Sequence, residues 1–172
     1  VARALASLAK PLEFRLFITD DREEFANDDR FPEADIIISE TPEQALPQLP
    51  INPNTFIVVA TRGHRYDNVA LLAAAKTAAK YVGLMGSKRK TILIYEDLIR
   101  EGLEYDRLNE IRSPIGLDIR ARTPEEIAIS IMSEILMFRL GGSGVPMKLD
   151  KKQIDRINEK VNRDSKTFVE TV

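Results

Sequence analysis

Phe56–Ala60 (Phe-Ile-Val-Val-Ala) is the strongest strand signal in the chain, because its apolar residues follow one another without a polar interruption. Runs of this kind are typical of strands that are buried on both faces of a parallel sheet. Residues 67–79 then have a helical composition, and residues 81–84 (Tyr-Val-Gly-Leu) predict a second buried strand. A strand, a helix and another strand in succession predict a parallel sheet with helices packed against it.

The same alternation extends toward both ends of the chain. Further strands are predicted at residues 14–19, 36–38 and 114–117, and further helices at residues 1–9, from 41 onward, at 87–100, 123–140 and 150–163. Thr123 followed by Glu126 forms a capping-box pattern, which marks the start of the helix at residues 123–140. We therefore expect an α/β fold, a doubly wound parallel sheet with helices on both faces and a helical extension at the C-terminal end.

The domain organisation follows from a glycine-rich break at residues 141–144. We expect one α/β domain over residues 1–140, a linker over 141–148 and a helical arm over 149–172. The arm is strongly charged except for a narrow stripe of Ile154, Ile157 and Val161. A helix this polar needs a partner surface for its stripe. That surface is either the chain's own domain or a second copy in a homodimer.

Composition excludes several functional classes. The 172 residues include 25 Lys+Arg and 27 Asp+Glu, a net charge of −2, which argues against nucleic acid as a partner. The longest apolar run, residues 69–75, is far shorter than the ~20 residues that span a bilayer. The absence of Cys excludes disulfides, thiolate zinc sites and a Cys nucleophile. We expect a cytoplasmic protein that uses no membrane as a partner.

The segments after the strands are where a ligand is expected, because ligands of open α/β sheets bind at the carboxyl ends of the strands. Asp20 follows the strand at residues 14–19, where an acidic side chain can accept hydrogen bonds from a ribose or can cap a turn. Arg62, Gly63 and His64 follow Phe56–Ala60. His64 is the only histidine, so a metal site is not expected; either anion or cofactor recognition or a structural role fits it.

The segment after residues 81–84 carries the sequence Gly86-Ser87-Lys88-Arg89. Gly86 permits a tight turn and Ser87 can cap the next helix, whose first N–H groups favour an anion. Lys88, Arg89 and Lys90 add positive charge, so the segment is either an anion site or a solvated basic turn. Asp118 follows the last predicted strand and either faces the same crevice or caps a turn.

Residues 61–64 (Thr-Arg-Gly-His), 83–89 (Gly-Leu-Met-Gly-Ser-Lys-Arg), 114–119 (Pro-Ile-Gly-Leu-Asp-Ile) and 123–128 (Thr-Pro-Glu-Glu-Ile-Ala) together form a recognisable order of motifs. The chain resembles the C-terminal Rossmann domain of the xanthine dehydrogenase accessory factor family (XdhC/CoxI). Residues 20–25 also resemble that family's segment after the second strand. The resemblance runs from Val1 to about Arg139.

The resemblance implies a Rossmann-like fold and a role in maturation of molybdenum enzymes. Family members bind the molybdenum cofactor (molybdopterin) and assist its insertion into a molybdenum hydroxylase such as xanthine dehydrogenase. It implies an apo molybdenum hydroxylase as partner, with a sulfurase as a further candidate, and favours a cofactor-binding maturation factor over an enzyme with catalytic residues. Cofactor contacts are implied for Asp20, Arg62, Gly63, His64, Gly86, Ser87, Lys88, Arg89 and Asp118. An NAD(P)-binding oxidoreductase-like domain and a non-catalytic interaction scaffold are the alternatives.

One Rossmann element is not found in the sequence. Members of the family begin this domain with a strand and a glycine-rich loop, but no glycine precedes Gly63. In a Rossmann sheet the first strand lies between the strands that correspond to residues 14–19 and Phe56–Ala60. We expect these two strands not to pair with each other, and we expect an apolar upstream segment to occupy the space between them.

Overall fold

The computed structural model describes residues 1–169, except for the side chains of His64 and of residues 163–169. The chain divides into two compact units, of which the first is Val1–Gly142 and the second begins at Ser143. Each unit is described by itself.

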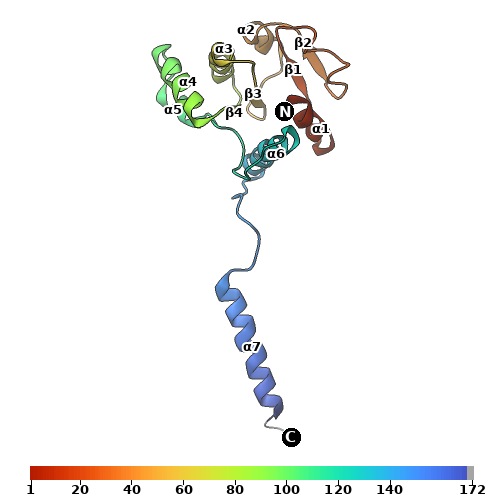
Figure 1. Cartoon of the computed structure of the whole chain (residues 1–172), viewed down its shortest axis with the longest axis vertical. Coiled ribbons are helices and arrows are strands. Elements are labelled where there is room, and N and C mark those ends of the chain that lie inside the picture. Colours follow the sequence, from red (N-terminus) through yellow and green to blue (C-terminus); the bar gives the residue numbers. More distant parts are fainter. Residues whose placement is uncertain (170–172) are drawn as a thin grey trace. The chain divides into compact units, whose positions relative to one another are not determined.

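The strands of the first unit form two parallel pairs (Figure 1). β1 (Phe17–Thr19) pairs with β2 (Ile36–Ile38), and β3 (Phe56–Val59) pairs with β4 (Tyr81–Leu84). Within the described residues no ladder joins β1 to β3. The prediction that these two strands do not pair directly is therefore confirmed.

Most of the helices lie where the apolar and capping patterns of the sequence predict them. The elements of the first unit are α1 (Ala2–Ala9), η1 (Lys10–Leu12), α2 (Pro42–Ala45), η2 (Leu46–Gln48), α3 (His64–Ala75), α4 (Lys88–Arg100), α5 (Tyr105–Glu110) and α6 (Pro124–Leu140). Ser87 caps α4 by accepting a hydrogen bond from the Lys90 N–H. Thr123 and Glu126 form the predicted capping box at the start of α6.

The β3–β4 pair separates two hydrophobic clusters. Val82 and Leu84 pack with α3, α4 and α5 on one face, whereas Tyr81 packs with α1 and α6 on the other. This division follows from the strand period of two, which sends successive side chains to opposite faces. All four residues of β4 are buried, so helices cover both faces of this strand as predicted.

Several elements differ from the sequence prediction. β1 begins at Phe17 rather than at residue 14, and α3 ends at Ala75 rather than at residue 79. α3 begins at His64 rather than at residue 67, because Gly63 already ends the preceding extended segment. Residues 114–117 form no strand; instead Arg112 makes an isolated bridge to Gly83. Pro114 lacks an N–H donor, which explains why a ladder does not continue through it. The short helix α5 was not predicted.

A buried polar network fixes α6 beneath β4. The Tyr81 hydroxyl donates to Glu134 Oε2 at 2.8 Å, and the Gly116 N–H donates to the same oxygen at 2.8 Å. Burial and the neighbouring Glu134 raise the pKa of Tyr81, so its hydroxyl remains a donor at ordinary pH. Gly116 has φ +102°, and a Cβ there would meet the Ser130 hydroxyl at 2.5 Å. The network therefore holds the chain close to α6 just before residue 118.

Replacement Tyr81→Phe tests this network. The change removes one of the two donors to a buried carboxylate, and we expect a loss of ~1–3 kcal/mol in the free energy of unfolding. Urea denaturation followed by circular dichroism measures the loss. The matched control is Tyr105→Phe, because Tyr105 is 75% exposed and its replacement should change stability by no more than ~0.5 kcal/mol. Equal stability of the two variants would contradict the role given to Tyr81.

The second unit consists of an extended segment followed by α7 (Lys151–Val169). The Asp150 side chain caps this helix by accepting from the Gln153 N–H at 2.8 Å. Ile154, Ile157 and Val161 are each about half exposed, at 52%, 53% and 56%. The predicted apolar stripe is therefore present on α7.

Truncation after Gly142 tests the independence of the first unit. Both hydrophobic clusters are formed by residues that precede Gly142, so we expect residues 1–142 to keep a cooperative unfolding transition at an unchanged temperature. Thermal denaturation measures this, and loss of the transition would contradict it. Light scattering of the full chain and of the truncated chain tests the homodimer alternative. An oligomeric state that is the same in both chains would exclude a dimer held together by α7.

Candidate functional site

The candidate site lies at the carboxyl edge of the strands. Segments following β1, β3 and β4 meet there, because both strand pairs are parallel and an ion pair joins their ends. A cavity of about 1220 Å³ opens beside this edge and is lined by all residues of β1 and β3. Asp20, Asp21, Thr61 and Arg62 also line it, so the polar edge and the apolar space between the strands are continuous.

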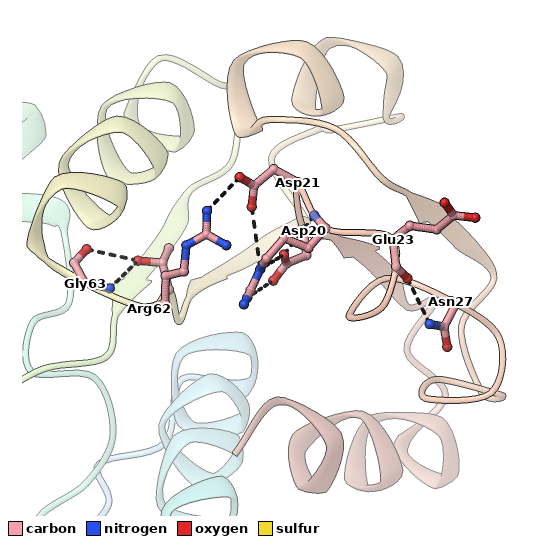
Figure 2. A network of polar contacts seen from close by, with 8 residues as sticks. Asp20, Asp21, Glu23, Asn27, Arg62 and Gly63 are labelled. Atoms are coloured by element: carbon pink, nitrogen blue, oxygen red, sulfur yellow. Dashed lines mark hydrogen bonds and ion pairs between the residues drawn. The ribbon is translucent and has the colours of Figure 1, made fainter.

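Asp20 is held by its neighbour Arg22 (Figure 2). Arg22 Nε donates to Asp20 Oδ1 at 2.9 Å and Nη2 donates to Oδ2 at 3.0 Å, which is a bidentate pair. The Arg22 N–H donates to Oδ1 as well, at 3.1 Å, and the guanidinium lies 3.7 Å from the centre of the Phe25 ring. Both carboxylate oxygens of Asp20 therefore already accept hydrogen bonds within the chain.

Arg62 connects the two strand pairs across the cavity (Figure 2). Its Nη2 donates to Asp21 Oδ2 at 2.9 Å, and its guanidinium lies 4.0 Å from the centre of the Tyr66 ring. Asp21 follows β1 and Arg62 follows β3, so the segments that sequence analysis placed at one edge do meet. Both side chains are 34% exposed, which leaves their outer faces open to solvent.

The loop after β3 is fixed by Asp67, which is fully buried. The Thr61 hydroxyl donates to Asp67 Oδ1 at 2.8 Å, and the Lys90 ammonium forms an ion pair with Oδ2. Because Lys90 belongs to α4, this ion pair ties the first turns of α3 and α4 together. A Cβ at Gly63 would meet no atom within 4 Å, so the backbone there faces open space. His64 begins α3, and its side chain lies outside the described residues.

The start of α4 presents a basic surface. Ser87, Lys88 and Arg89 are exposed, and Ser87 Oγ accepts from the Lys90 N–H at 3.3 Å. A Cβ at position 86 would meet Lys90 Cδ at 3.2 Å, so the glycine leaves room for the Lys90 side chain beside this turn. The parallel register of Val59 with Leu84 places this turn at the same edge as the loop after β3.

Asp118 is not joined to the other predicted residues by a direct contact among the described side chains. It is exposed, and its Oδ1 accepts from the Arg120 N–H at 3.3 Å, which makes a local turn. This contact of Asp118 agrees with the second of the two roles expected from the sequence, in which Asp118 caps a turn.

Sequence reasoning missed Asp21, Arg22 and Asp67 as members of this edge, and it placed Lys90 there without its pairing to Asp67. Asp21 and Arg22 directly follow Asp20, so their position after β1 was visible in the sequence. The burial of Asp67 and its pairing with Lys90 could not be read from either residue type. Among residues 1–169, no cluster of three His, Cys, Asp or Glu has metal-binding geometry, and no helix combines the length and apolar character that a bilayer requires.

A family model described as the XdhC Rossmann domain matches residues 1–135. The chain belongs to the XdhC family. The predicted resemblance is thereby confirmed, and with it the Rossmann-like α/β fold. A solved structure named as a xanthine dehydrogenase from Bacillus halodurans is similar in fold, with a TM-score of 0.70 and 29% identity. The match covers 81% of this chain and 41% of that one.

Curated relatives support the same XdhC membership. YqeB of Escherichia coli (strain K12) is 32% identical over 145 residues, which are 84% of this chain and 26% of the relative. A probable xanthine dehydrogenase subunit from Bacillus subtilis (strain 168) is 33% identical over 135 residues, 78% of this chain and 39% of the relative. Molybdenum cofactor insertion chaperone PaoD of Escherichia coli (strain K12) is 27% identical over 90 residues, which are 52% of this chain and 28% of the relative. The chain thus spans well under half the length of each relative.

The Asp20–Arg22 pair gives this XdhC chain a testable pH dependence. Partial burial raises the pKa of Asp20, but the hydrogen bonds and charge of Arg22, with the charge of Arg62, outweigh it and hold the pKa below its ordinary value. The folded pKa is below the unfolded one, so the stabilisation is complete above the unfolded pKa and is lost as pH falls through the folded pKa.

Replacement Arg22→Gln should raise the pKa of Asp20, as measured by carboxyl-carbon NMR titration. Arg100→Gln serves as the control, because Arg100 pairs with Glu96 and Asp97 at the far end of α4 and its loss should leave Asp20 unchanged. An Asp20 carboxyl that titrates identically in the original chain and the Arg22 variant would refute the assignment.

Proposed function

We propose that this chain binds the molybdenum cofactor at the carboxyl edge of its strands and assists its insertion into an apo molybdenum hydroxylase such as xanthine dehydrogenase. Membership of the XdhC family supports this role. Two relatives support it by name, since one is a molybdenum cofactor insertion chaperone and another is a probable xanthine dehydrogenase subunit. The proposal concerns binding and delivery, with no catalytic residue assigned.

The observation that carries the proposal is the convergence of two helix starts on one basic edge. α3 has 12 residues and α4 has 13, they pack together, and both begin at this edge. Free N–H groups of a helix's first turn carry partial positive charge and favour phosphate. The molybdopterin carries a phosphate, and exposed Lys88 and Arg89 add full charges to the same surface.

The residues present fit an anionic group for a further reason. Positive side chains in the first turn of a helix oppose the helix dipole, by a few tenths of a kcal/mol each. α4 nevertheless begins with Lys88, Arg89 and Lys90, and only Lys90 has its charge directed to the buried Asp67. A bound anion would turn the unfavourable placement of the other two into a favourable one.

The other residues are assigned supporting roles in this proposal. Gly63 leaves the backbone accessible before α3, and Arg62 lies beside it with an exposed face. Gly86 and Ser87 shape the turn into α4. We include Asp20, His64 and Asp118 among the proposed cofactor contacts because each follows a predicted strand in the sequence. When bound, the cofactor supplies the metal and its dithiolene; the chain's residues bind its anionic groups and shield it.

A dinucleotide is the second candidate ligand, and the place of Asp20 after β1 is the observation that favours it. A ribose contact there requires the carboxylate to accept from the sugar hydroxyls. Arg22 occupies both of its oxygens in a bidentate pair, which makes such a contact less favourable. Direct titration with NAD(H) and with molybdopterin distinguishes the two candidates.

The double replacement Lys88→Ala, Arg89→Ala tests the proposed anion contacts. Charge-assisted hydrogen bonds contribute ~1.5–3 kcal/mol each, so loss of these side chains should raise the dissociation constant for molybdopterin at least tenfold. Isothermal titration calorimetry measures it. Both side chains are exposed, so the free energy of unfolding should change by no more than ~0.5 kcal/mol per site.

The matched control is Lys151→Ala, Lys152→Ala in α7, which removes the same charge from exposed positions in the second unit. It should leave the dissociation constant unchanged. Equal weakening by both double variants would show a non-specific charge effect, and no weakening by either would refute the assignment of Lys88 and Arg89. Transfer of cofactor to an apo hydroxylase, followed by that enzyme's activity, tests the delivery step separately.

A further inference from the structure

α4 packs one side against the core and exposes the other. Its buried residues recur at the helical spacing of three and four, and are Thr91, Ile94 and Leu98. The exposed side carries three large apolar residues, Ile92, Leu93 and Ile99, which are 59%, 48% and 54% exposed. Ile92 and Ile99 lie almost in line along the helix, since two turns separate them, and Leu93 lies beside Ile92. We call these three residues the α4 face. It leaves apolar surface in contact with water, which is unfavourable.

The two ends of α4 carry opposite charges. Its first two residues, Lys88 and Arg89, are basic and exposed. Glu101 ends the helix and Glu104 follows it, and both are acidic and exposed. Within residues 91–104 the only basic residue is Arg100, which pairs with acidic side chains of α4 itself. Both ends therefore oppose the helix dipole, which favours acidic residues at the start of a helix and basic residues at its end.

This pattern is complementary to a second copy of itself in the opposite direction. In an antiparallel pair of α4 helices the acidic end of each lies beside Lys88 and Arg89 of the other, so both unfavourable ends meet opposite charge. The apolar residues also coincide, because a two-fold axis between the helices brings Ile92 of one copy opposite Ile99 of the other. Glu96 lies between these two positions along the helix, and its charge is already paired with Arg100.

We propose that the α4 face is the interface of a homodimer in which two α4 helices pack antiparallel. A two-fold dimer requires a surface that is complementary to itself, and the α4 face with its two charged ends meets this requirement. The surface is small, so the association is reversible rather than permanent. It uses no residue of α7. Lys88 and Arg89 also belong to the proposed anion contacts, so an anion bound there competes with the second copy.

Two single replacements test the interface. Sedimentation equilibrium of the full chain, at protein concentrations up to about 1 mM, measures the dissociation constant of the dimer. Ile92→Glu and Ile99→Lys each place a charge against an apolar side chain of the other copy, so each should raise that constant at least tenfold. Both positions are more than half exposed, so both variants should keep the circular dichroism spectrum of the original chain.

The double replacement Ile92→Glu, Ile99→Lys tests the direction of the helices. In an antiparallel pair each introduced carboxylate faces the introduced ammonium of the other copy. The dissociation constant should therefore be at least fivefold lower than that of either single variant. In a parallel pair like charges would face each other, and the double variant would associate more weakly than both single variants.

The matched control is Ile129→Glu, because Ile129 is an isoleucine of α6 with a similar exposure of 49%. It should change the dissociation constant less than twofold. Four results would overturn the proposal: no association at the highest concentration, no weakening by the single variants, equal weakening by the control, or a double variant weaker than both single variants. None of these measurements includes the cofactor, so the outcome is separate from that of the proposed function.

Discussion

The parallel ladder between β3 and β4 is the interaction on which the rest of the first unit depends. Its register pairs Val59 with Leu84, so the two strands end together and α3 and α4 begin side by side. The same ladder divides the core, because successive side chains of β4 enter different hydrophobic clusters. A shift of one residue would send Tyr81 to the opposite face and separate it from Glu134.

Two buried carboxylates secure the helices that the ladder positions. Asp67 joins α3 to α4 through Lys90, and Glu134 joins α6 to Tyr81 and to the backbone at Gly116. A buried charge is costly unless it is paired or hydrogen-bonded, so each carboxylate tolerates few alternative arrangements of its partners. The helices that begin at the candidate edge are consequently held in place by buried polar contacts.

Local sequence signals predicted much of this fold. β2 and β4 were predicted with their observed bounds, because apolar runs between polar turn residues are strong strand signals. The capping box at Thr123 located the start of α6 for a similar reason. The segment at Pro114 was predicted wrongly as a strand: Arg112 bridges to Gly83 and the Ile115 N–H donates to the Leu84 carbonyl, but Pro114 between them interrupts a continuous ladder. α5 is short and polar, so it gave no periodic signal.

The candidate site was predictable in outline and not in its contacts. Topology places the residues after parallel strands at one edge, and this requires only the order of the elements. The pairing of Asp20 with Arg22 and of Asp21 with Arg62 depends on side-chain geometry that the sequence does not specify. The same holds for the complete burial of Asp67.

The Asp21–Arg62 ion pair has a consequence for how the two strand pairs respond to the surrounding solution. Both partners are partly exposed, and the Debye length falls from ≈ 10 Å at 0.1 M to 3 Å at 1 M ionic strength. Exposed ion pairs contribute at most ~1 kcal/mol, and added salt lowers that further. No backbone ladder within the described residues supplements this link between β1 and β3. Added salt therefore weakens this polar link at the carboxyl edge, whereas the helices beneath it, joined by buried groups, are screened far less.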